Sequence, residues 1–372
     1  MKKILITGSK GFIGKNLIAH LQINKIFQLF QYDLDVSEKK LEEWLHDADF
    51  IFHLAGINRP KDEQEYKAGN TDFTVYLINR LMEAGKKTPI VFSSSIQATL
   101  ENPYGISKRN AEEVLFKYRE TGAPVYIYRL SNVFGKWSRP NYNSVVATFC
   151  HNIAHELPIQ VNNPDLLLTL VYIDDIVAEF IDVLKKGKAT VRDYYQIPIS
   201  HQITLQAMAD RLYAIHNNRE TLVVPDLANS LTKKLHATYL SYLPEDRFSY
   251  PLKLNSDKRG NLFELIKSPH FGQIFVSTTK PGIIRGNHYH HTKNEKFVVL
   301  KGEAEIKFRH ILNDKVITYR VSGDQPQVVD IPTGYTHSIK NIGKEEMITF
   351  FWSNEPFNPD NPDTYFDQVE KG

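Results

Sequence analysis

The first 200 residues of the chain alternate between short apolar runs and helix-like patterns. The apolar runs have the length of buried strands, and between two of them residues 72–84 repeat apolar side chains at helical spacing. Because parallel neighbouring strands need a crossover helix, this alternation predicts a parallel, doubly wound sheet of the α/β Rossmann-like class. The expected strands are 4–6, 29–32, 50–54, 90–92 and 125–129.

The pattern changes in the last third of the chain. Helices are expected at 205–215 and 230–242, and "LPEDRFSYP" then interrupts the helical pattern. Beyond it, short β-rich runs are separated by "KPG", "NDK", "SGD" and "PTGY", which is typical of an all-β barrel or sandwich. The sequence therefore predicts two domains, residues 1–245 and residues 246–372.

Composition excludes several classes of protein. The 372 residues carry a net charge of only +2, so nothing indicates a nucleic-acid partner. The single cysteine, Cys150, rules out an intramolecular disulfide and fits a reducing compartment. The N-terminal apolar run is too short for a signal peptide, and no stretch approaches the ~20 apolar residues of a membrane span. We expect a soluble cytoplasmic protein without a membrane partner.

The stretch "ILITGSKGFIGKNLIAHL" predicts a strand, a glycine turn and a helix. Gly8, Gly11 and Gly14 follow the spacing GxxGxxG. Glycine permits the tight turn and leaves room for a pyrophosphate, to which the helix N-terminus offers free N–H groups. A dinucleotide site is expected, the alternative being a glycine turn without a ligand. Asp33 could bind the ribose 2′-hydroxyl of NAD, whereas Lys10 could meet the 2′-phosphate of NADP.

A second motif, "YGISK", places Tyr104 four residues before Lys108, on the same face of an expected helix. An ammonium group beside a phenol lowers the pKa of the phenol. Such a phenol can pass a proton to a carbonyl oxygen while hydride reaches the carbon. A serine of the preceding strand, Ser95 or Ser94, could hydrogen-bond the same oxygen. The alternative is a solvated helix face.

These segments resemble the extended short-chain dehydrogenase/reductase family of nucleotide-sugar enzymes. The resemblance covers roughly residues 1–245 and rests on "TGSKGFIG", "HLAG", "SSS", "YGISK", "YRLSNVFG" and "VYIDDIV". It implies catalytic roles for Tyr104, Lys108 and Ser95, with Ser94 as second choice. The cofactor site implied by the resemblance consists of Gly8, Ser9, Lys10, Gly11, Phe12, Ile13, Gly14, Asp33, Leu54, Ala55, Gly56, Tyr104, Lys108 and Asn132.

The chain departs from the family pattern in two spacings. The gap from Ser95 to Tyr104 is short, which implies a trimmed loop over the substrate. Only 45 residues separate Gly8 from His53, fewer than family members usually have. We therefore expect one strand–helix unit to be compressed between them. The residue that reads the adenosine ribose is therefore uncertain, and both Asp33, which favours NAD, and Lys10, which favours NADP, remain candidates.

Near the end of the chain, "GIIRGNHYHHTKNEKFVVLKG" and "PTGYTHSIKN" concentrate histidines and a glutamate. His288 and His290 point to the same side of a strand, while Glu295 returns from the next strand and His337 from a later one. Three imidazoles and one carboxylate inside a barrel suit Zn, Fe, Mn or Ni. The alternative is a histidine-rich surface hairpin. By alternation, His291 is expected to point outward.

Both segments resemble the paired motifs of the cupin family, over about residues 252–369. Related sugar epimerases use a metal-free histidine and acid pair, so the fold fixes neither metal nor reaction. The four ligand types favour a divalent transition metal, with zinc as our choice. The epimerase base stays open: His288 or His290 could serve only if it is not a metal ligand. Tyr335, Lys296 and Arg285 are expected to flank the pocket.

A reductase joined to a cupin resembles the bifunctional enzymes of capsular-polysaccharide synthesis. The resemblance implies that the cupin epimerises C3 of a UDP-2-acetamido-2,6-dideoxy-4-hexulose and that the reductase then reduces the C4 ketone with NADPH. The product would be UDP-2-acetamido-2,6-dideoxy-L-talose, on the route to UDP-N-acetyl-L-fucosamine. A homodimer is expected from fold analogy only.

Two other functions fit the same sequence. In one, the cupin is a metal dioxygenase or isomerase, and the reductase acts on an unrelated ketone. In the other, the chain is a simple NAD(P)H-dependent ketosugar reductase whose cupin only senses a ligand or dimerises. Metal content and proton exchange at the α-carbon of a ketosugar separate these functions.

Overall fold

The computed structural model describes residues 1–23, 25–188 and 194–371. The chain forms two compact units, one of Met1–Tyr213 with Lys233–Pro244, the other of Ala214–Thr232 with Glu245–Gly372. The short stretch Ala214–Thr232 joins the second unit through a bridge between Val223 and Lys267. This contact is made by backbone groups, and nothing in the local sequence pattern announces it.

The first unit contains a five-stranded parallel sheet in the order β2-β1-β3-β4-β5. The sheet confirms the predicted α/β Rossmann-like fold, and each expected strand has its counterpart. The strands are β1 (Lys2–Thr7), β2 (Phe27–Tyr32), β3 (Phe50–His53), β4 (Ile90–Ser95) and β5 (Val125–Leu130). The helices around them are α1 (Phe12–Gln22), α2 (Glu38–Asp47), α4 (Phe73–Glu83), α5 (Pro103–Glu120) and α7 (Ile173–Lys186).

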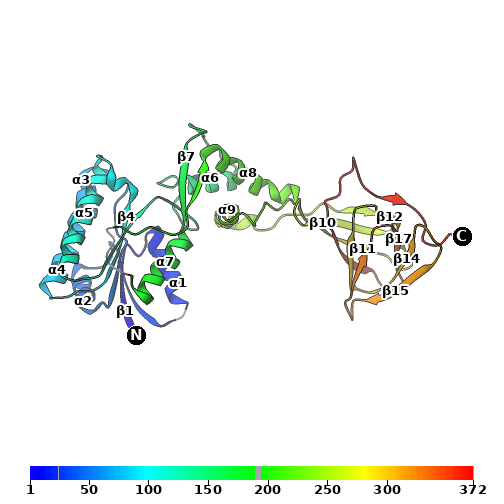
Figure 1. Cartoon of the computed structure of the whole chain (residues 1–372), viewed down its shortest axis with the longest axis horizontal. Helices are drawn as coiled ribbons and strands as arrows, with labels where there is room; N and C mark the ends of the chain where they lie inside the picture. The colour runs from blue at the N-terminus through cyan, green and yellow to red at the C-terminus, as the bar shows by residue number, and fades with distance from the viewer. Residues whose placement is uncertain (24, 189–193, 372) are drawn as a thin grey trace. The chain divides into compact units, whose positions relative to one another are not determined.

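Both faces of this sheet are buried. Ile4 and Ile6 pack in one core together with residues of α1 and α7, whereas Leu5 packs in a second core with α2, α4 and α5. In Figure 1, α1 and α7 lie on one side of the sheet and α4 and α5 on the other. Burial on both faces explains why the strands read as continuous apolar runs without alternation.

Between the end of α1 and the start of β3, the described part of the chain makes only one strand and one helix, β2 and α2. This is the compression that the 45-residue spacing predicts. Because β2 and β3 lie on opposite sides of β1, the strand order reverses at β1. In open α/β sheets, the crevice at such a reversal is where ligands bind.

The first unit also contains a small three-stranded sheet, β6-β7-β8. The expected helices at 205–215 and 230–242 correspond to α8 and α9. The bounds are β6 (Asn132–Phe134), β7 (Leu167–Tyr172), β8 (His201–Thr204), α6 (Val145–Ala154), α8 (Leu205–Thr221) and α9 (Ser230–Leu240). The first unit includes α8 only up to Tyr213 and α9 only from Lys233. Short turns of helix complete the chain at α3 (Gln64–Tyr66), η1 (Lys67–Asp72), η2 (Ile96–Thr99) and η3 (Glu245–Arg247).

The second unit contains two antiparallel sheets, as predicted for an all-β cupin barrel. Their orders are β16-β13-β18-β11-β10-β9 and β15-β14-β17-β12-β19. The core that they share includes Phe297 and Phe351 from one sheet and Ile306 and Ile339 from the other. The strands are β9 (Asn255–Asp257), β10 (Gly260–Ser268), β11 (Gly272–Thr279), β12 (Ile284–Tyr289), β13 (Glu295–Lys301), β14 (Glu303–His310), β15 (Val316–Ser322), β16 (Val328–Ile331), β17 (Tyr335–Asn341), β18 (Met347–Ser353) and β19 (Tyr365–Phe366).

A buried arginine fastens the C-terminal segment to this barrel. The Arg309 side chain on β14 is 1% exposed and donates to the carbonyls of Val369 at 3.1 Å and Gln368 at 2.9 Å, and to the carboxylate of Asp367 at 2.5 Å. Thr336 donates to the carbonyl of Asp367, also at 2.5 Å. A guanidinium with this many acceptors is satisfied in the interior, so the segment is held firmly in place.

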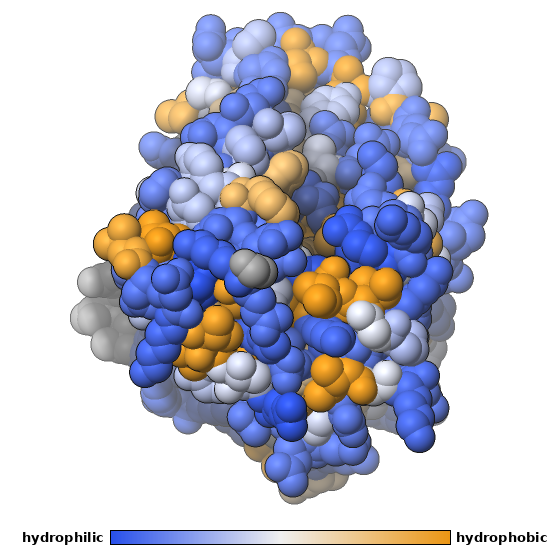
Figure 2. All heavy atoms as spheres, turned by 90° about the vertical axis from the view of Figure 1, so that its right-hand side faces the viewer, coloured by the Kyte–Doolittle hydropathy of each residue, from blue (hydrophilic) through white to orange (hydrophobic). Residues whose placement is uncertain are grey.

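None of the described helices is long and apolar enough to cross a membrane. On the face drawn in Figure 2, apolar side chains form separate small groups among predominantly hydrophilic ones. Scattered apolar groups of this kind are ordinary on globular proteins.

Candidate functional site

The glycine turn between β1 and α1 packs directly on the segment that follows β3. Gly8 has a φ of +68°, and a Cβ there would lie 2.7 Å from the Ala55 nitrogen. A Cβ on Gly14 would lie 2.3 Å from the Gly8 carbonyl oxygen. Gly11 is the N-cap of α1, and no side chain caps the helix. The first N–H groups of α1 are therefore available to an anion such as a pyrophosphate.

The two residues expected to choose between NAD and NADP lie together at the rim of this turn. Asp33 accepts a hydrogen bond from the Lys10 backbone N–H at 2.8 Å. The Lys10 ammonium pairs with Asp35 at 2.7 Å, and both side chains of that pair are more than half exposed. An exposed pair of this kind is weak, so Lys10 can exchange Asp35 for another anion. Asp35 has no counterpart in the sequence predictions.

The expected catalytic residues meet at the carboxyl end of β4. Tyr104 lies in the first turn of α5, where the Asn102 side chain caps the helix by accepting from the Gly105 N–H at 2.7 Å. Ser95 ends β4, and its side chain interacts with the Tyr104 phenol. Ser94 instead donates to the buried carboxylate of Glu112 at 2.5 Å. The geometry thus favours Ser95 over Ser94 as the partner of Tyr104.

The environment of Lys108 differs from the expectation. Its ammonium is buried and donates to the Ser93 carbonyl at 3.1 Å, and burial lowers its pKa to about 8. Burial also raises the pKa of Tyr104, with a partial offset from Ser95. The expectation that Lys108 lowers the pKa of the phenol is therefore wrong for this arrangement. Desolvation of the phenol outweighs any effect of an ammonium that is directed at a backbone carbonyl.

A buried ion pair between Glu112 and Arg129 lies near Lys108. Glu112 is 1% exposed and accepts from Arg129 at 2.9 and 2.6 Å, in addition to Ser94. The predictions missed both charged residues. Glu112 follows Lys108 by four residues, as Lys108 follows Tyr104, so the helical spacing of the motif already placed it on the same face.

The remaining cofactor candidates lie on nearby loops. A Cβ on Gly56 would lie 2.9 Å from the Lys108 ammonium and from the side-chain oxygen of Asn70. Asn70 also holds the loop by accepting from the Ile57 N–H at 2.9 Å. Leu54 and Ala55 follow β3 directly, and Ser9, Phe12 and Ile13 belong to the turn or to the start of α1. Asn132, on β6, is exposed and donates to the Thr169 carbonyl at 3.2 Å.

A buried histidine lies beneath the turn. His53 at the end of β3 is 1% exposed, and its two ring nitrogens lie 2.8 Å from the Thr7 hydroxyl and 2.9 Å from the Thr74 hydroxyl. Burial, with a smaller contribution from Lys108, lowers the pKa of His53 to about 3. The imidazole is therefore neutral at neutral pH and has a structural role.

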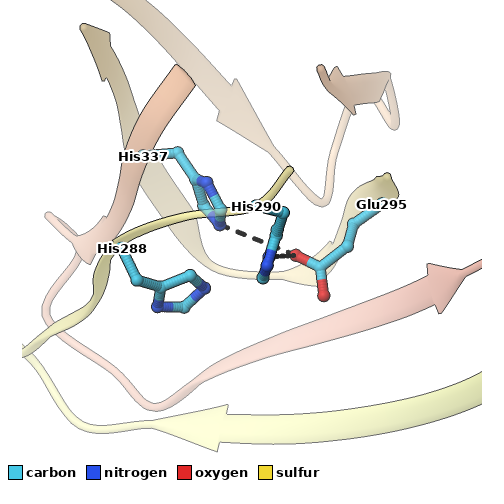
Figure 3. A group of neighbouring side chains, drawn as sticks. All are labelled: His288, His290, Glu295 and His337. Atoms are coloured by element: carbon cyan, nitrogen blue, oxygen red, sulfur yellow. Dashed lines mark ion pairs between the residues drawn. The ribbon is translucent and has the colours of Figure 1, made fainter. Parts of the chain in front are cut away.

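In the second unit, the four expected ligands converge from three strands and the loop after β12 (Figure 3). Donor atoms of His288, His290, Glu295 and His337 all lie within 4.8 Å of one another. A bulge in β12 between Gly286 and His288, with Asn287 at a φ of +58°, turns the end of the strand toward the others. His291 is exposed, as alternation predicts.

The donor set fits a metal ion. One oxygen of Glu295 lies 3.6 Å from Nε2 of His290 and 3.6 Å from Nε2 of His337, which is too long for a hydrogen bond. Both Nε2 atoms are buried without a hydrogen-bond partner among the described residues. Two ligands of a tetrahedral zinc ion, each at about 2.0–2.1 Å, lie about 3.4 Å apart. A cation among these atoms would satisfy all of them.

The protonation states of His288 and Glu295 suit the same role, whereas burial lowers the pKa of His290 but Glu295 and the Asp363 carbonyl outweigh it and raise that pKa. Burial lowers the pKa of His288 to about 4, so this imidazole is neutral. Burial raises the pKa of Glu295, but the imidazoles of His290 and His337 outweigh it and bring the pKa to about 2. A neutral imidazole and an ionised carboxylate are the forms that bind metal.

The four side chains His288, His290, Glu295 and His337 form a cage of metal-ligand atoms. This cage opens into a cavity of about 540 Å³. His288, His290 and Glu295 lie on its wall together with Lys253, Lys267 and Lys293. Tyr335, Lys296 and Arg285, which were expected to flank the pocket, are not among its lining residues. Lys296 faces outward and pairs with Asp330, and Arg285 donates to Thr279 at 3.1 Å. The sequence predicted the cage correctly but not the walls around it.

Two family models match the chain. Residues 4–197 match the NAD dependent epimerase/dehydratase family, and residues 255–365 match the polysaccharide biosynthesis C-terminal domain. The UDP-2-acetamido-2,6-beta-L-arabino-hexul-4-ose reductase of Pseudomonas aeruginosa is 45% identical over 371 residues, with 100% of each chain covered.

The structure is also similar to a solved one. The capsular polysaccharide assembling protein CapF of Staphylococcus aureus is 48% identical and superimposes with a TM-score of 0.92 over 98% of this chain and 99% of that chain. A more distant relative, the spore coat polysaccharide biosynthesis protein SpsL of Bacillus subtilis, is 28% identical over 122 residues, covering 30% of this chain and 81% of its own.

We predict that His53 makes the first unit sensitive to acid. Its pKa is about 3 in the folded chain and 6.5 ordinarily, so the unfolded chain binds the extra proton between these values. Stability is therefore lost as the pH falls through this window, by about 2 kcal/mol between pH 7 and pH 5. In His53→Gln, the side chain can still bond the threonines but does not titrate.

Urea unfolding at both pH values, followed by the far-ultraviolet signal of the helices, measures this effect. The wild-type chain should lose about 2 kcal/mol more than His53→Gln between pH 7 and pH 5. Equal losses in the two proteins would contradict the prediction.

Proposed function

Because the chain belongs to the NAD dependent epimerase/dehydratase family, as a CapF-like member with a polysaccharide biosynthesis C-terminal domain, we propose that it epimerises and reduces a UDP-linked acetamido-ketosugar. The substrate is a UDP-2-acetamido-2,6-dideoxy-4-hexulose, and the product is UDP-2-acetamido-2,6-dideoxy-L-talose. Residues 1–245 carry out the reduction and residues 246–372 the epimerisation at C3. The observation that carries the proposal is the full-length match to a reductase of such a sugar.

In the reduction, the glycine turn of Gly8, Gly11 and Gly14 would hold the nicotinamide cofactor, which when bound would supply the hydride for C4 of the sugar. Tyr104 donates its phenolic proton to the C4 oxygen, and the Ser95 hydroxyl hydrogen-bonds the same oxygen and holds the ketone in place. The burial that keeps Tyr104 protonated suits a general acid. Lys108 lies next to Gly56, and its positive charge stabilises the phenolate that forms when Tyr104 gives up its proton. NADPH is the proposed cofactor.

In the epimerisation, a base removes the proton on C3, which is acidic because it is α to the C4 carbonyl. A divalent metal held by His288, His290, Glu295 and His337 would stabilise the negative charge that develops on the carbonyl oxygen. Reprotonation from the opposite face inverts C3. Lysine side chains on the wall of the cavity suit the negative charge of the UDP group. The volume of the cavity, about 540 Å³, falls in the usual range of ligand pockets.

The order of the two steps follows from their chemistry. Enolisation at C3 needs the C4 ketone, and reduction removes that ketone. Epimerisation must therefore come first, and reduction then locks both centres.

We expect Tyr104→Phe to separate the two steps. Loss of the general acid should lower the rate of NADPH oxidation with the ketosugar by about 10²- to 10⁴-fold. Exchange of the C3 proton in D2O, followed by NMR without NADPH, should be unchanged. Tyr76→Phe is the matched control, because the Tyr76 hydroxyl on α4 binds Glu42 at 3.2 Å, away from these residues. Reduction at the wild-type rate in Tyr104→Phe would refute the assignment.

Lys10→Ala should shift the cofactor preference. Loss of one charged contact to the 2′-phosphate should lower kcat/KM for NADPH by roughly 10-fold, while that for NADH changes little. Lys15→Ala, on the exposed face of α1, serves as the control. A wild-type preference for NADH would instead assign the ribose 2′-hydroxyl to Asp33.

His337→Ala tests the role of the cage. The variant should bind zinc far more weakly in metal analysis, and C3 exchange should fall by about 10²-fold or more. His291→Ala is the matched control, since this neighbouring histidine is exposed and lies outside the cage. Full C3 exchange and talose formation by His337→Ala would favour a reductase whose cupin is a sensing or dimerising module.

A further inference from the structure

The second ring nitrogen of His290, Nδ1, contacts the C-terminal segment of the chain. His290 is 2% exposed, and its Nδ1 lies 2.6 Å from the backbone carbonyl oxygen of Asp363. A carbonyl oxygen can only accept a hydrogen bond, so Nδ1 carries the proton. Nε2 is then left with its lone pair. This is the atom that faces Glu295, and no described residue offers it a hydrogen bond (Figure 3). The bond to Asp363 thus selects the tautomer that can bind a metal through Nε2.

The Asp363 side chain fastens the same residue to the loop between β12 and β13. Its carboxylate accepts from the N–H groups of His291 at 3.0 Å, Thr292 at 2.8 Å and Lys293 at 2.8 Å. It also accepts from the Thr292 hydroxyl at 2.9 Å. This loop joins two of the expected ligands, His290 and Glu295. One carboxylate therefore ties the loop of the cage to the segment that supplies the carbonyl.

Asp363 itself adopts a backbone conformation that side chains rarely take. Its φ is +40°, in the left-handed region where the Cβ of a residue other than glycine is crowded by the backbone. Such a conformation persists only where the surroundings hold it. Here the four hydrogen bonds to the carboxylate hold it from one side. From the other side, β19 pairs with β12, with Phe366 opposite His288, and Arg309 fixes the residues that follow.

We propose that Asp363 is a positioning residue of the metal centre: its carbonyl fixes the tautomer and ring orientation of His290, and its carboxylate holds that carbonyl in place. The inference rests on the proposed metal site. Groups that orient metal ligands in this way typically change metal affinity by about 10- to 100-fold when they are removed.

The test uses the full-length chain and three substitutions. Asp363→Gly removes the carboxylate, and glycine adopts the positive φ without strain. Any effect of this variant therefore comes from the lost hydrogen bonds and not from backbone strain. Asp363→Asn keeps one acceptor oxygen and should have an intermediate effect. Asp360→Gly is the matched control, because Asp360 is an exposed aspartate of the same segment. Zinc affinity is measured by competition with a chromophoric chelator, and cobalt(II) replaces zinc to give an absorption spectrum that reports the ligand geometry.

Asp363→Gly should bind zinc about 10- to 100-fold more weakly than wild type. Its cobalt spectrum should change in position or intensity, while its metal-free form unfolds close to the wild-type temperature. Asp360→Gly should match wild type in affinity and spectrum. If Asp363→Gly does not fold, Asp363→Asn decides the question through the same two measurements.

Equal zinc affinity and an unchanged cobalt spectrum in the folded Asp363 variants would overturn this inference while leaving the metal site intact. Loss of affinity in proportion to a loss of stability of the metal-free form, with an unchanged spectrum, would also overturn it, because the role of Asp363 would then be only structural. Failure of the wild-type chain to bind zinc or cobalt would overturn both the metal site and the positioning role.

Discussion

The single carboxylate of Glu295 lies at equal distances of 3.6 Å from two buried imidazole nitrogens, which have no hydrogen-bond partner in the part of the chain that the structure describes. A protein interior does not tolerate this arrangement without a compensating charge, because unsatisfied buried polar atoms each cost about 1–3 kcal/mol. The bulge in β12, the neutral state of His288 and the ionised state of Glu295 all bring lone pairs to the same small volume. The barrel is built around a position that a cation would fill.

The site in the first unit depends on backbone segments that pack very closely. Gly8, Gly14 and Gly56 each leave space where a Cβ would collide with a neighbouring chain segment or with Lys108. The turn can therefore pack on the segment after β3 while the N-terminus of α1 stays uncapped. Behind it, the Glu112–Arg129 pair keeps a charged network buried next to Lys108. The site depends as much on these missing side chains as on Tyr104 and Ser95.

Local spacing made most of this architecture predictable. Strands buried on both faces, the glycine turn and the Tyr104–Lys108 pair are patterns within one or two elements, and the structure reproduces them. The cage was predictable because three of its four residues lie within eight positions of one another, from His288 to Glu295. The helical register that links Tyr104 to Lys108 also contained Glu112, whose role was overlooked although its position could be read.

Other features could not be predicted from the sequence. Some are made by backbone groups, and one depends on burial outweighing the effect of a neighbouring charge. Val223 joins the second unit by a main-chain bridge to Lys267, which any residue could make. The pKa of Tyr104 rises because desolvation exceeds the influence of Lys108, a balance that depends on depth of burial. Asp363 contributes a carbonyl oxygen from 73 residues away, and no residue type marks such a contact.

The separation of 73 residues between His290 and Asp363 has a consequence for how the protein is synthesised. Chains emerge from the ribosome N-terminus first, and their domains fold as they appear. His290 must wait for 73 further residues before the carbonyl that selects its tautomer exists. The Rossmann-like sheet, complete by Leu130, can form long before this. The proposed metal site is consequently completed late in the synthesis of the chain, after the strands of the Rossmann-like sheet have all been made.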